Sequence, residues 1–230
     1  MNLLEKEQLI TEAAERFERE SPEELLKFAA ATFPKLTLAC SFGAEDVALV
    51  DLLQKVSPQT DIFYLDTDFH FQETYATRDA LSSRYGLTFL QVKPKLTPEE
   101  QARRYGGELW KTDPDQCCNI RKVDPLVNIL GQYDAWITGI RRDQAPTRAN
   151  TKKVEYDVKF GLVKFNPLAD WTSEDVWNYI RQNNVPYNPL HDRNYPSIGC
   201  EHCTRPVAPG EDPRAGRWAG TEKTECGLHK

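Results

Sequence analysis

The sequence contains no apolar run close to the roughly 20 residues that a membrane-spanning helix requires. Its first 20 residues mix acidic and basic side chains throughout, whereas a secretory signal has an uninterrupted apolar stretch. We therefore expect a cytoplasmic protein that neither crosses a membrane nor is secreted.

An excess of basic residues is also absent. The chain has 29 Lys and Arg residues against 35 Asp and Glu residues, which gives a formal net charge of -6. Proteins that bind the phosphate backbone of nucleic acids usually carry a net basic surface. Nucleic acid is thus not expected as a partner, and any small anion must be bound by a local cluster of cations.

Internal repeats and low-complexity tracts are missing as well, and the composition is that of an ordinary globular protein, with 40% hydrophobic and 28% charged residues. A length of 230 residues suits one well-filled domain with a modest appendage. We expect an α/β domain with N-terminal helices over residues 1–185. Proline, glycine, asparagine and charged residues dominate after Pro186, so residues 186–230 are predicted to form an irregular segment docked on that domain.

Short apolar runs alternate with segments of helical periodicity along the predicted domain. Such alternation is typical of a doubly wound fold, in which a mainly parallel sheet is covered by helices on both faces. A charged leading helix is followed by a second helix that begins at Ser21 and Pro22. The predicted strands are 36–42, 61–66, 87–93 and 135–140, the predicted helices are 44–56, 71–86, one from Thr97 and 176–184, and 154–168 is predicted to form a hairpin.

The first loop of interest joins the first predicted strand to its helix and has the sequence Ser41-Phe42-Gly43-Ala44-Glu45-Asp46. In an open α/β sheet this is where ligands bind, since the following helix offers free N–H groups to an anion. The loop matches neither the dinucleotide fingerprint nor the Walker pattern. Its sequence alone fits a phosphate loop and an ordinary strand-to-helix turn about equally well.

Two later strand ends carry groups of the same kind. Asp66 and Thr67 follow the second strand, where they could face the ligand or simply cap the next helix. Arg141, Arg142 and Arg148 follow the strand 135–140, and guanidinium groups suit bidentate recognition of phosphate or sulfate. A solvated loop would explain the arginines alone, but three strand ends with anion-binding groups favour a shared site.

Four of the six cysteines are arranged in two pairs, Cys117-Cys118 and Cys200-x-x-Cys203. In a reducing compartment such pairs indicate metal or redox chemistry rather than disulfides, and four thiolates can hold either zinc or an iron-sulfur cluster. Adjacent cysteines suit a tetrahedral zinc site poorly and a larger cluster better. A thioredoxin-like dithiol is disfavoured because the second pair leads into Pro206 rather than a helix. Cys40, inside an apolar strand, is expected to be a buried core residue.

Cys226 lies four residues from the last residue of the sequence, in a segment with few apolar neighbours. An exposed cysteine is a good nucleophile when cations stabilise its thiolate. Arg214, Arg217, Lys223 and His229 could supply that positive charge.

These residues resemble the assimilatory adenylyl-sulfate and phosphoadenylyl-sulfate reductases from about Leu36 onward. The motifs that carry the resemblance are Ser41 to Asp46, Leu65-Asp66-Thr67, Cys117-Cys118-Asn119-Ile120-Arg121-Lys122, Gly139 to Arg148, Cys200 to Pro206, Arg214 to Trp218, and Glu225-Cys226-Gly227-Leu228-His229. The last of these is nearly diagnostic of the family.

The resemblance implies a fold of the adenine-nucleotide alpha-hydrolase type, related to the ATP pyrophosphatases. It implies that the Ser41 loop, with Asp66, Thr67, Arg141 and Arg148, holds adenosine 5'-phosphosulfate. It further implies a 4Fe-4S cluster on Cys117, Cys118, Cys200 and Cys203, with Lys122 between the cluster and the sulfate, and a catalytic Cys226 surrounded by Arg214, Arg217 and His229.

The activity that the resemblance implies is thioredoxin-dependent reduction of adenosine 5'-phosphosulfate to sulfite and AMP, through an S-sulfonate on Cys226. The partners would be that substrate and thioredoxin, and a homo-oligomer is left open. Three alternatives stay open on sequence alone: a phosphoadenylyl-sulfate reductase, an ATP-pyrophosphatase-type adenylating enzyme, and a zinc-stabilised nucleotide-binding module.

Overall fold

The structure is a computed structural model that describes residues 3–221, 223, 225 and 227–228, with side chains described from Glu7 onward. Six strands form one sheet in the order β3-β2-β1-β4-β6-β5. Their bounds are β1 Leu36–Ala39, β2 Asp61–Leu65, β3 Leu90–Val92, β4 Ala135–Ile137, β5 Val154–Asp157 and β6 Leu162–Phe165. All neighbouring pairs are parallel except β5 and β6, which pair antiparallel at one edge. The predicted mainly parallel α/β fold is confirmed.

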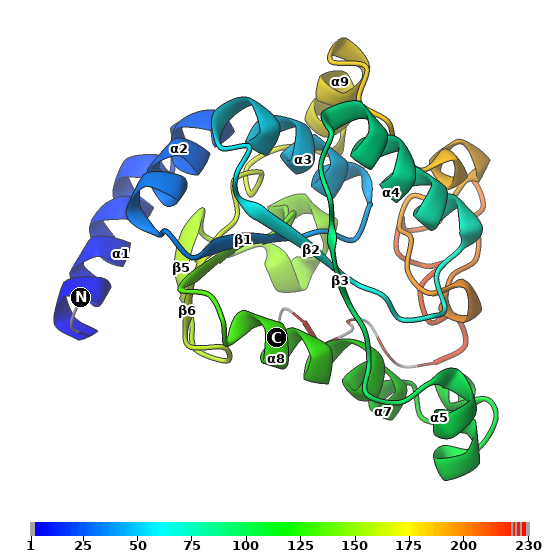
Figure 1. Ribbon diagram of the computed structural model, residues 1–230. Helices are drawn as coiled ribbons and strands as arrows, with labels where there is room; N and C mark the ends of the chain where they lie inside the picture. The colour runs from blue at the N-terminus through cyan, green and yellow to red at the C-terminus, as the bar shows by residue number, and fades with distance from the viewer. Residues whose placement is uncertain (1–2, 222, 224, 226, 229–230) are drawn as a thin grey trace.

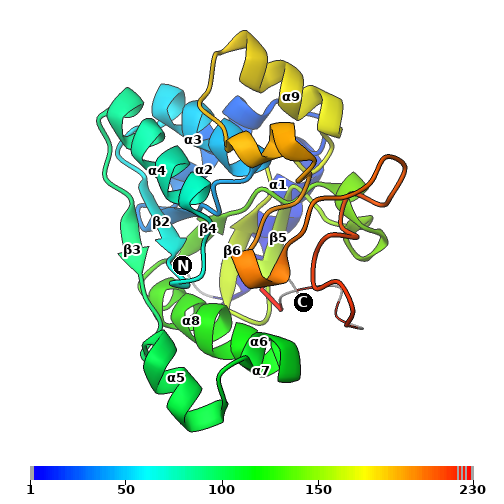
Figure 2. The ribbon, with the colours of Figure 1, turned by 90° about the vertical axis from the view of Figure 1, so that its right-hand side faces the viewer.

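Helices cover both faces of this sheet, as Figure 1 shows. On one face lie α1 (Leu3–Phe17), α2 (Pro22–Thr32), α3 (Ala44–Val56), α4 (Gln72–Tyr85) and α9 (Ser173–Gln182). On the other face lie α5 (Pro98–Tyr105), α6 (Leu109–Thr112), α7 (Pro114–Cys118) and α8 (Asp124–Leu130), as Figure 2 shows. The crossovers through α3 and α4 therefore run on one face, and the crossover that reaches β4 runs on the other.

Alternation along the strands divides the core into two layers. Leu36 and Leu38 of β1 pack under the α1–α4 layer, together with Ile62 and Tyr64 of β2. Phe63, which lies between these two β2 residues, faces the other way. Successive strand side chains point to opposite faces, so each buried strand must be apolar on both sides. The second layer consists of Phe63, Leu126, Leu130, Trp136 and Leu162.

Local signals set where the helices begin. Ser21 accepts a hydrogen bond from the backbone N–H of Glu24 at 3.3 Å, and Pro22 is the first residue of α2. Thr97 and Thr172 each form a capping box, at the starts of α5 and α9. These side chains satisfy N–H groups that have no partner inside the helix.

The structure differs from the predicted strands in length and in pairing. The expected strand 36–42 ends at Ala39, because the chain turns at Cys40 and Phe42 takes a positive φ of 62°. The predicted hairpin 154–168 is present as β5 and β6, and β6 also pairs in parallel with β4. The hairpin thus extends the main sheet instead of standing apart from it.

One turn of π-helix, η1 (Asn119–Val123), joins α7 to α8 without a break. A π-helical turn closes i to i+5 hydrogen bonds and so contains one residue more than an α-helical turn; such turns are frequent at functional sites. Here it separates the cysteine pair at the end of α7 from the core residues of α8.

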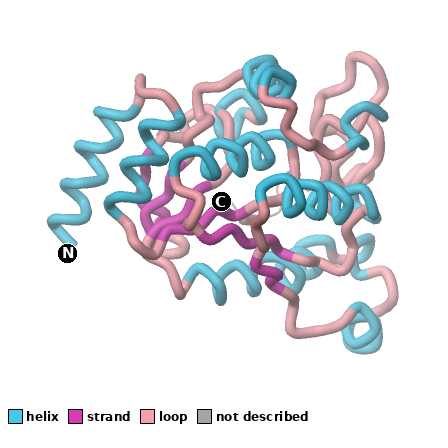
Figure 3. Tube along the Cα trace, turned by 45° about the horizontal axis from the view of Figure 1, so that its top comes forward, coloured by secondary structure: helices cyan, strands magenta, loops and turns pink. Residues whose placement is uncertain are grey.

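The segment after α9 is mostly loop, as Figure 3 shows. Its regular elements are short 3-10 turns, η4 (Pro189–Arg193) and η5 (Glu201–Cys203); η2 (Arg142–Gln144) and η3 (Pro146–Arg148) lie earlier, in the loop after β4. An antiparallel bridge joins His70 to Cys200, and the Glu201 N–H donates to the Phe69 carbonyl at 2.8 Å. The irregular segment therefore contacts the chain just after β2, while the division at residue 185 stays a prediction.

Among the residues that the structure describes, no helix is both long enough and apolar enough to span a membrane.

Candidate active site

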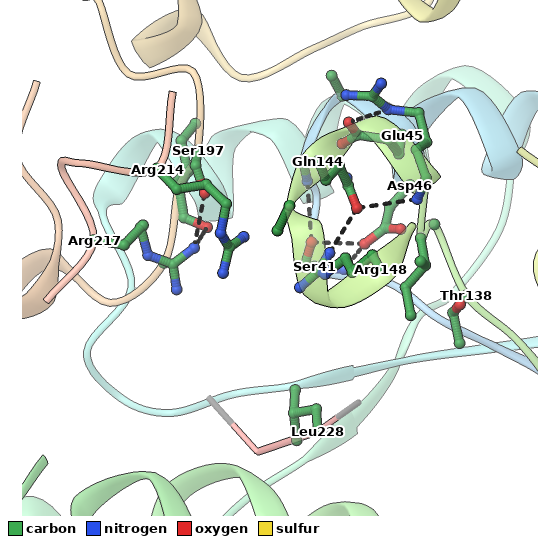
Figure 4. A pocket seen from close by; sticks show the side chains of 18 of the residues that line it. Ser41, Glu45, Asp46, Thr138, Gln144, Arg148, Ser197, Arg214, Arg217 and Leu228 are labelled. Carbon is green, nitrogen blue, oxygen red and sulfur yellow. Dashed lines mark hydrogen bonds and ion pairs between the residues drawn. The ribbon is translucent and has the colours of Figure 1, made fainter. Parts of the chain in front are cut away.

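A cavity of about 610 Å³ opens at the carboxyl ends of β1 and β4. The chain runs from β1 to β2 in one direction along the sheet, whereas β4 lies on the other side of β1. Such a reversal leaves a crevice between the loops of the two strands, where open α/β sheets bind ligands. Figure 4 shows Ser41 from the loop after β1, Glu45 and Asp46 from the first turn of α3, and Thr138, Gln144 and Arg148 from the chain after β4.

Asp46 fixes the shape of the loop after β1. Its Oδ2 accepts hydrogen bonds from both the N–H and the hydroxyl of Ser41, each at 2.6 Å. Burial raises the pKa of the Asp46 carboxyl to about 6, although the two bonds from Ser41 oppose that rise. The predicted phosphate loop is therefore held by an acid of its own helix, and Ser41, Gly43, Glu45 and Asp46 all line the cavity.

Gly139 allows the two loops to approach each other closely. A Cβ atom at this position would lie 2.9 Å from the Cβ of Glu45 and would collide with the Asp46 carboxylate. Any side chain at this residue would push the loop after β1 away from the loop after β4, so glycine is required by the packing rather than by backbone conformation.

The predicted arginines of the loop after β4 line the cavity, but acidic partners hold them. The Arg141 Nε donates to Glu45 at 2.9 Å, and its guanidinium also pairs with Asp143. The Nη1 of Arg148 donates to the Gln144 side chain at 2.6 Å, and its Nε and Nη2 donate to the two carboxylate oxygens of Glu225 at 3.0 and 2.8 Å. Arg141 thus joins the two loops, and Arg148 joins the site to the C-terminal segment.

Two further arginines reach the cavity from the C-terminal segment. Arg214 donates to Glu225 at 3.0 Å, and Arg217 donates to the Ser197 hydroxyl at 3.0 Å. The Arg217 Nε is buried with no hydrogen-bond partner among the described atoms, and its guanidinium lies 4.5 Å above the Trp218 ring. A Cβ on Gly199 would lie 2.5 Å from an Arg217 nitrogen, so this glycine makes room for the guanidinium.

Two predicted binding residues are not brought to the cavity. The Phe42 side chain packs in the core against Tyr64 and Phe89, with ring centroids 5.4 and 5.0 Å away. The Asp66 carboxylate is buried and accepts hydrogen bonds from Tyr75 at 2.7 Å and Gln91 at 2.5 Å. Neither lines the cavity, whereas Thr67 does.

The four paired cysteines line one smaller cavity next to the first. Aromatic rings form part of its wall: Trp110 stacks on His202 with ring centroids 4.2 Å apart, and Phe69 packs edge-on against both. Thr67 and Cys200 are hydrogen-bonded at 3.4 Å, and Gln101 donates to the Cys117 sulfur at 3.8 Å. The structure thus brings together Cys117, Cys118, Cys200 and Cys203, as the sequence predicts.

The chemistry of this donor set suits a group that binds thiolates. Burial, with a contribution from Cys200, raises the pKa of Cys117 to about 11 and that of Cys203 to about 12. Thiols with a raised pKa, such as these two, become good ligands when a cationic centre compensates the thiolate charges. No group of three or more His, Cys, Asp or Glu side chains in the described part of the chain is arranged to hold a metal ion. The four cysteines share one cavity without forming such a group in the described arrangement, so a thiolate-bound cofactor stays a proposal.

Arg121 and Lys122 follow the cysteine pair in the π-helical turn and separate the two cavities. Lys122 lines both cavities, as does Trp218. Arg121 is buried, donates to Gln101 at 2.8 Å and to Asp68 at 3.1 Å, and lines the cysteine cavity. Its Nη2 is buried with no hydrogen-bond partner among the described atoms. Lys122 therefore borders both the cysteine cavity and the larger cavity, and its place between a cluster and the sulfate, which the resemblance implies, stays a prediction.

Two predicted catalytic residues, Cys226 and His229, lie outside the described residues. The neighbouring Glu225 is described and is buried against the arginines. Sequence reasoning missed Glu225 as a site residue, and it assigned no role to Thr138, His191 or Ser197, which also line the cavity. The one available signal was the position of Glu225 directly before Cys226, in a motif already singled out.

A protein-family model described as the phosphoadenosine phosphosulfate reductase domain matches residues 35–206. A protein of Halalkalibacterium halodurans named adenosine 5'-phosphosulfate reductase is 54% identical over 223 residues, which are 96% of each chain. A protein of Bacillus subtilis named adenosine 5'-phosphosulfate reductase 2 is 52% identical over 209 residues, 90% of this chain and 89% of the relative.

Solved structures are similar at two levels. A phosphoadenylyl-sulfate reductase from Candida auris, solved as a phosphate complex, has 33% identity and a TM-score of 0.77 over 85% of this chain and 96% of its own. An FMN adenylyltransferase from Candida glabrata has 17% identity and a TM-score of 0.57 over 86% of this chain and 73% of its own, which shows a shared fold alone. From the match over residues 35–206 and the identity to its relatives, the chain belongs to the phosphoadenosine phosphosulfate reductase family.

Proposed function

We propose that the protein reduces adenosine 5'-phosphosulfate to sulfite and AMP in sulfate assimilation, with electrons from thioredoxin. The observation that carries this proposal is a pair of adjoining cavities. Arginines line one of them, at the carboxyl ends of β1 and β4, and four cysteines line the other, while Lys122 lines both. The relatives that share 52–54% of their residues are named as reductases of this nucleotide.

The larger cavity suits the charge of such a substrate. The loop from Ser41 to Asp46 would bind the nucleotide end, because it leads into the N-terminus of α3. Lys122, Arg214 and Arg217 would surround the sulfate. Positive charge is needed here, since a thiolate that attacks an anionic sulfonyl group must overcome electrostatic repulsion.

In the first chemical step the Cys226 thiolate attacks the substrate's sulfur atom. A sulfur–sulfur bond forms, the bond from sulfur to the bridging phosphate oxygen breaks, and AMP leaves with the bonding electron pair. The guanidinium groups would stabilise the charge that develops on the departing phosphate. The product on the protein is an S-sulfonate of Cys226.

In the second step a thioredoxin thiolate attacks the Cys226 sulfur. Sulfite leaves with the electron pair of the sulfur–sulfur bond, and a mixed disulfide remains. The second thioredoxin thiol resolves this disulfide and restores the Cys226 thiolate, so the dithiol supplies both electrons. Because the cytosol keeps thiols reduced, we place the protein in the cytoplasm.

We infer that Cys117, Cys118, Cys200 and Cys203 hold a 4Fe-4S cluster, since four cysteine thiols line one small cavity. When bound, the cluster would supply electrostatic stabilisation and order close to the sulfate. Protein purified under anaerobic conditions should be brown and should contain four irons, a ratio measurable by metal analysis. One zinc and no iron would overturn this part of the proposal.

The second candidate is reduction of 3'-phosphoadenosine 5'-phosphosulfate, which the similarity to the Candida auris reductase favours. Assaying sulfite release from each nucleotide with thioredoxin decides between the two. We expect sulfite and AMP from adenosine 5'-phosphosulfate and much slower turnover of the 3'-phosphorylated nucleotide. The opposite preference would replace the proposed substrate, and no sulfite from either would refute the reductase activity.

A further inference from the structure

Glu225 is a buried carboxylate in a segment that otherwise has little regular structure. Its side chain is 9% exposed, and it accepts three hydrogen bonds from guanidinium groups. Arg148 donates to both oxygens at 3.0 and 2.8 Å, and Arg214 donates to one of them at 3.0 Å. Acidic residues are seldom this buried unless they are paired, and bonds to an arginine fork are strong and directional.

The arginines that hold Glu225 also line the large cavity. A guanidinium has five N–H groups. Arg148 uses two of them for Glu225 and one for Gln144, which leaves two for another acceptor. Arg148 can therefore hold Glu225 and contact a bound anion at the same time.

Other contacts hold the chain on both sides of Glu225. Lys223 pairs with Asp115 and lies 5.7 Å from the Trp218 ring centroid. Beyond Glu225, the Lys159 ammonium donates to the Gly227 carbonyl at 2.5 Å, and Leu228 packs against the core layer that contains Phe63. Glu225 adds to these a direct ionic contact with the cavity itself.

We propose that Glu225 is a positioning residue, whose ion pairs with Arg148 and Arg214 fix the end of the chain so that the next residue, Cys226, can attack the bound substrate. The inference rests on the proposed function for its chemical consequence. Neighbouring Cα atoms are only about 3.8 Å apart, so the place of Glu225 limits the reach of the residue after it. Displacing a reacting group by about 1 Å can slow a reaction about a hundredfold.

Glu225→Gln is the sharpest variant because it keeps the size of the side chain and removes its charge. One of the two oxygens becomes an NH₂ group, which cannot accept a hydrogen bond from a guanidinium. Arg148 and Arg214 keep their charges, so the attraction of the cavity for an anion is retained. The variant therefore tests the position of the C-terminal segment alone.

The first measurement needs no substrate. The Lys223 side chain is 6% exposed, so trypsin should cut after it slowly while the segment is held. In Glu225→Gln we expect this cleavage to be at least about ten times faster, since breaking a buried pair releases the segment. Mass spectrometry of the released C-terminal peptide gives the rate.

The second measurement follows the reaction. Without thioredoxin, S-sulfonate formation on the peptide containing Cys226 should be about thirty times slower in Glu225→Gln, as expected for a misplaced nucleophile. Affinity for adenosine 5'-phosphosulfate, measured with Cys226→Ser in the background, should change by less than about threefold, since both arginine charges remain. Glu225→Asp, which keeps the charge on a shorter side chain, should recover part of the rate.

The matched control is Glu211→Gln, which removes an exposed carboxylate that pairs with Arg205 in the same segment. It should leave cleavage, rate and affinity unchanged. The inference would be wrong if Glu225→Gln were cleaved by trypsin and formed the S-sulfonate as fast as the unsubstituted protein. It would also be wrong if the affinity of Glu225→Gln for the nucleotide fell by the same factor as its rate of S-sulfonate formation. If the unsubstituted protein formed no S-sulfonate, the proposed function would be wrong, and the cleavage rates alone would still decide whether Glu225 holds the segment.

Discussion

At the residue scale, Asp46 couples the loop after β1 to pH. Burial raises its folded-state pKa to about 6, above the ordinary value of 3.8, so the folded protein binds this proton more tightly than the unfolded chain does. Its contribution to the free energy of unfolding therefore falls as pH rises from about 4 to about 6, by roughly 2–3 kcal/mol, and stays lower above that range. The free energy of unfolding of Asp46→Asn, measured with urea, should change less between about pH 4 and about pH 6 than that of the unsubstituted protein. An equal pH dependence of this free energy in the two proteins would contradict the assignment.

Gly139 gives a second prediction at this scale. Gly139→Ala should weaken binding of AMP at least about tenfold and reduce the free energy of unfolding by about 1–3 kcal/mol, since the added methyl group collides with Asp46 and Glu45. Calorimetric titration and urea unfolding measure the two effects. Gly131→Ala is the control, because its Cβ would lie 3.7 Å from the nearest atoms. Equal effects in the two variants would mean that the close approach of the loops is unimportant.

Many residues that line the two cavities could be predicted from the sequence, because residues with suitable chemistry stand at strand ends or in close pairs. Strand ends precede the Ser41 loop and the loop that contains Arg141 and Arg148. The close spacing of the cysteines within each pair indicates that they act together. Asp66 also follows a strand, yet its carboxylate accepts hydrogen bonds from Tyr75 and Gln91 and does not line the cavity. Sequence position fixes which edge of the sheet a residue reaches, but it does not fix which neighbour the side chain binds.

At the scale of elements, Asp51 ties three helices together. The carboxylate of this α3 residue accepts from Tyr85 of α4 at 2.7 Å and from Tyr179 of α9 at 2.6 Å, and it pairs with Lys55 at 2.7 Å. Burial acts to raise the pKa of Asp51, but these partners together hold it below the ordinary value. The carboxylate therefore stabilises the fold above its unfolded-state pKa of about 4, and this contribution is lost as pH falls through the lower folded-state value.

We expect Asp51→Asn to unfold at a lower urea concentration at pH 7, with a free energy of unfolding lower by about 1–3 kcal/mol. The neutral amide replaces a carboxylate that accepts hydrogen bonds from two tyrosines and pairs with Lys55. The difference between the two proteins should shrink when unfolding is repeated below pH 4. Asp79→Asn, which removes an exposed partner of Arg78, is a suitable control. A difference that did not depend on pH would show that the charge is not what ties the helices.

The order of elements was predictable, whereas their lengths were less so. Apolar periodicity marks every strand of the parallel core, but 36–42 and 135–140 are each cut short by the turns that build the site. Those turns contain buried residues such as Cys40 and Ile140, so hydropathy alone continues the strand through them. Pairing of β6 with β4 could not be foreseen either, since it depends on tertiary contacts rather than local pattern.

At the scale of the whole molecule, the apolar core depends little on the last residues. Both core layers are built from residues before 191, and Leu228 is only a partly buried neighbour of the second layer. A chain ended after Gly220 loses Leu228 and the buried ion pairs of Glu225 with Arg148 and Arg214, so its free energy of unfolding should fall by about 3–5 kcal/mol while unfolding stays one cooperative transition. Differential scanning calorimetry tests this. Loss of the transition would mean that the C-terminal segment is part of the folding core.

The π-helical turn Asn119–Val123 restricts the length of the chain, and not only its residues. Deleting one residue there would let an ordinary α-helical turn form in its place, because the π-helical turn has one residue more, and α8 would keep nearly its orientation relative to the cysteine pair. Inserting one residue would instead rotate α8 by about 100°, the angle that each residue of an α-helix adds. The deletion would therefore change the direction of the residues inside the turn and take Lys122 away from the wall between the two cavities. The insertion would take Leu126 and Leu130 out of the core. Substitutions in this turn can be compensated one side chain at a time, but a deletion displaces the lysine and an insertion displaces the core residues of α8. We therefore expect the number of residues between Cys118 and Leu126 to tolerate change less than the identity of most residues within it.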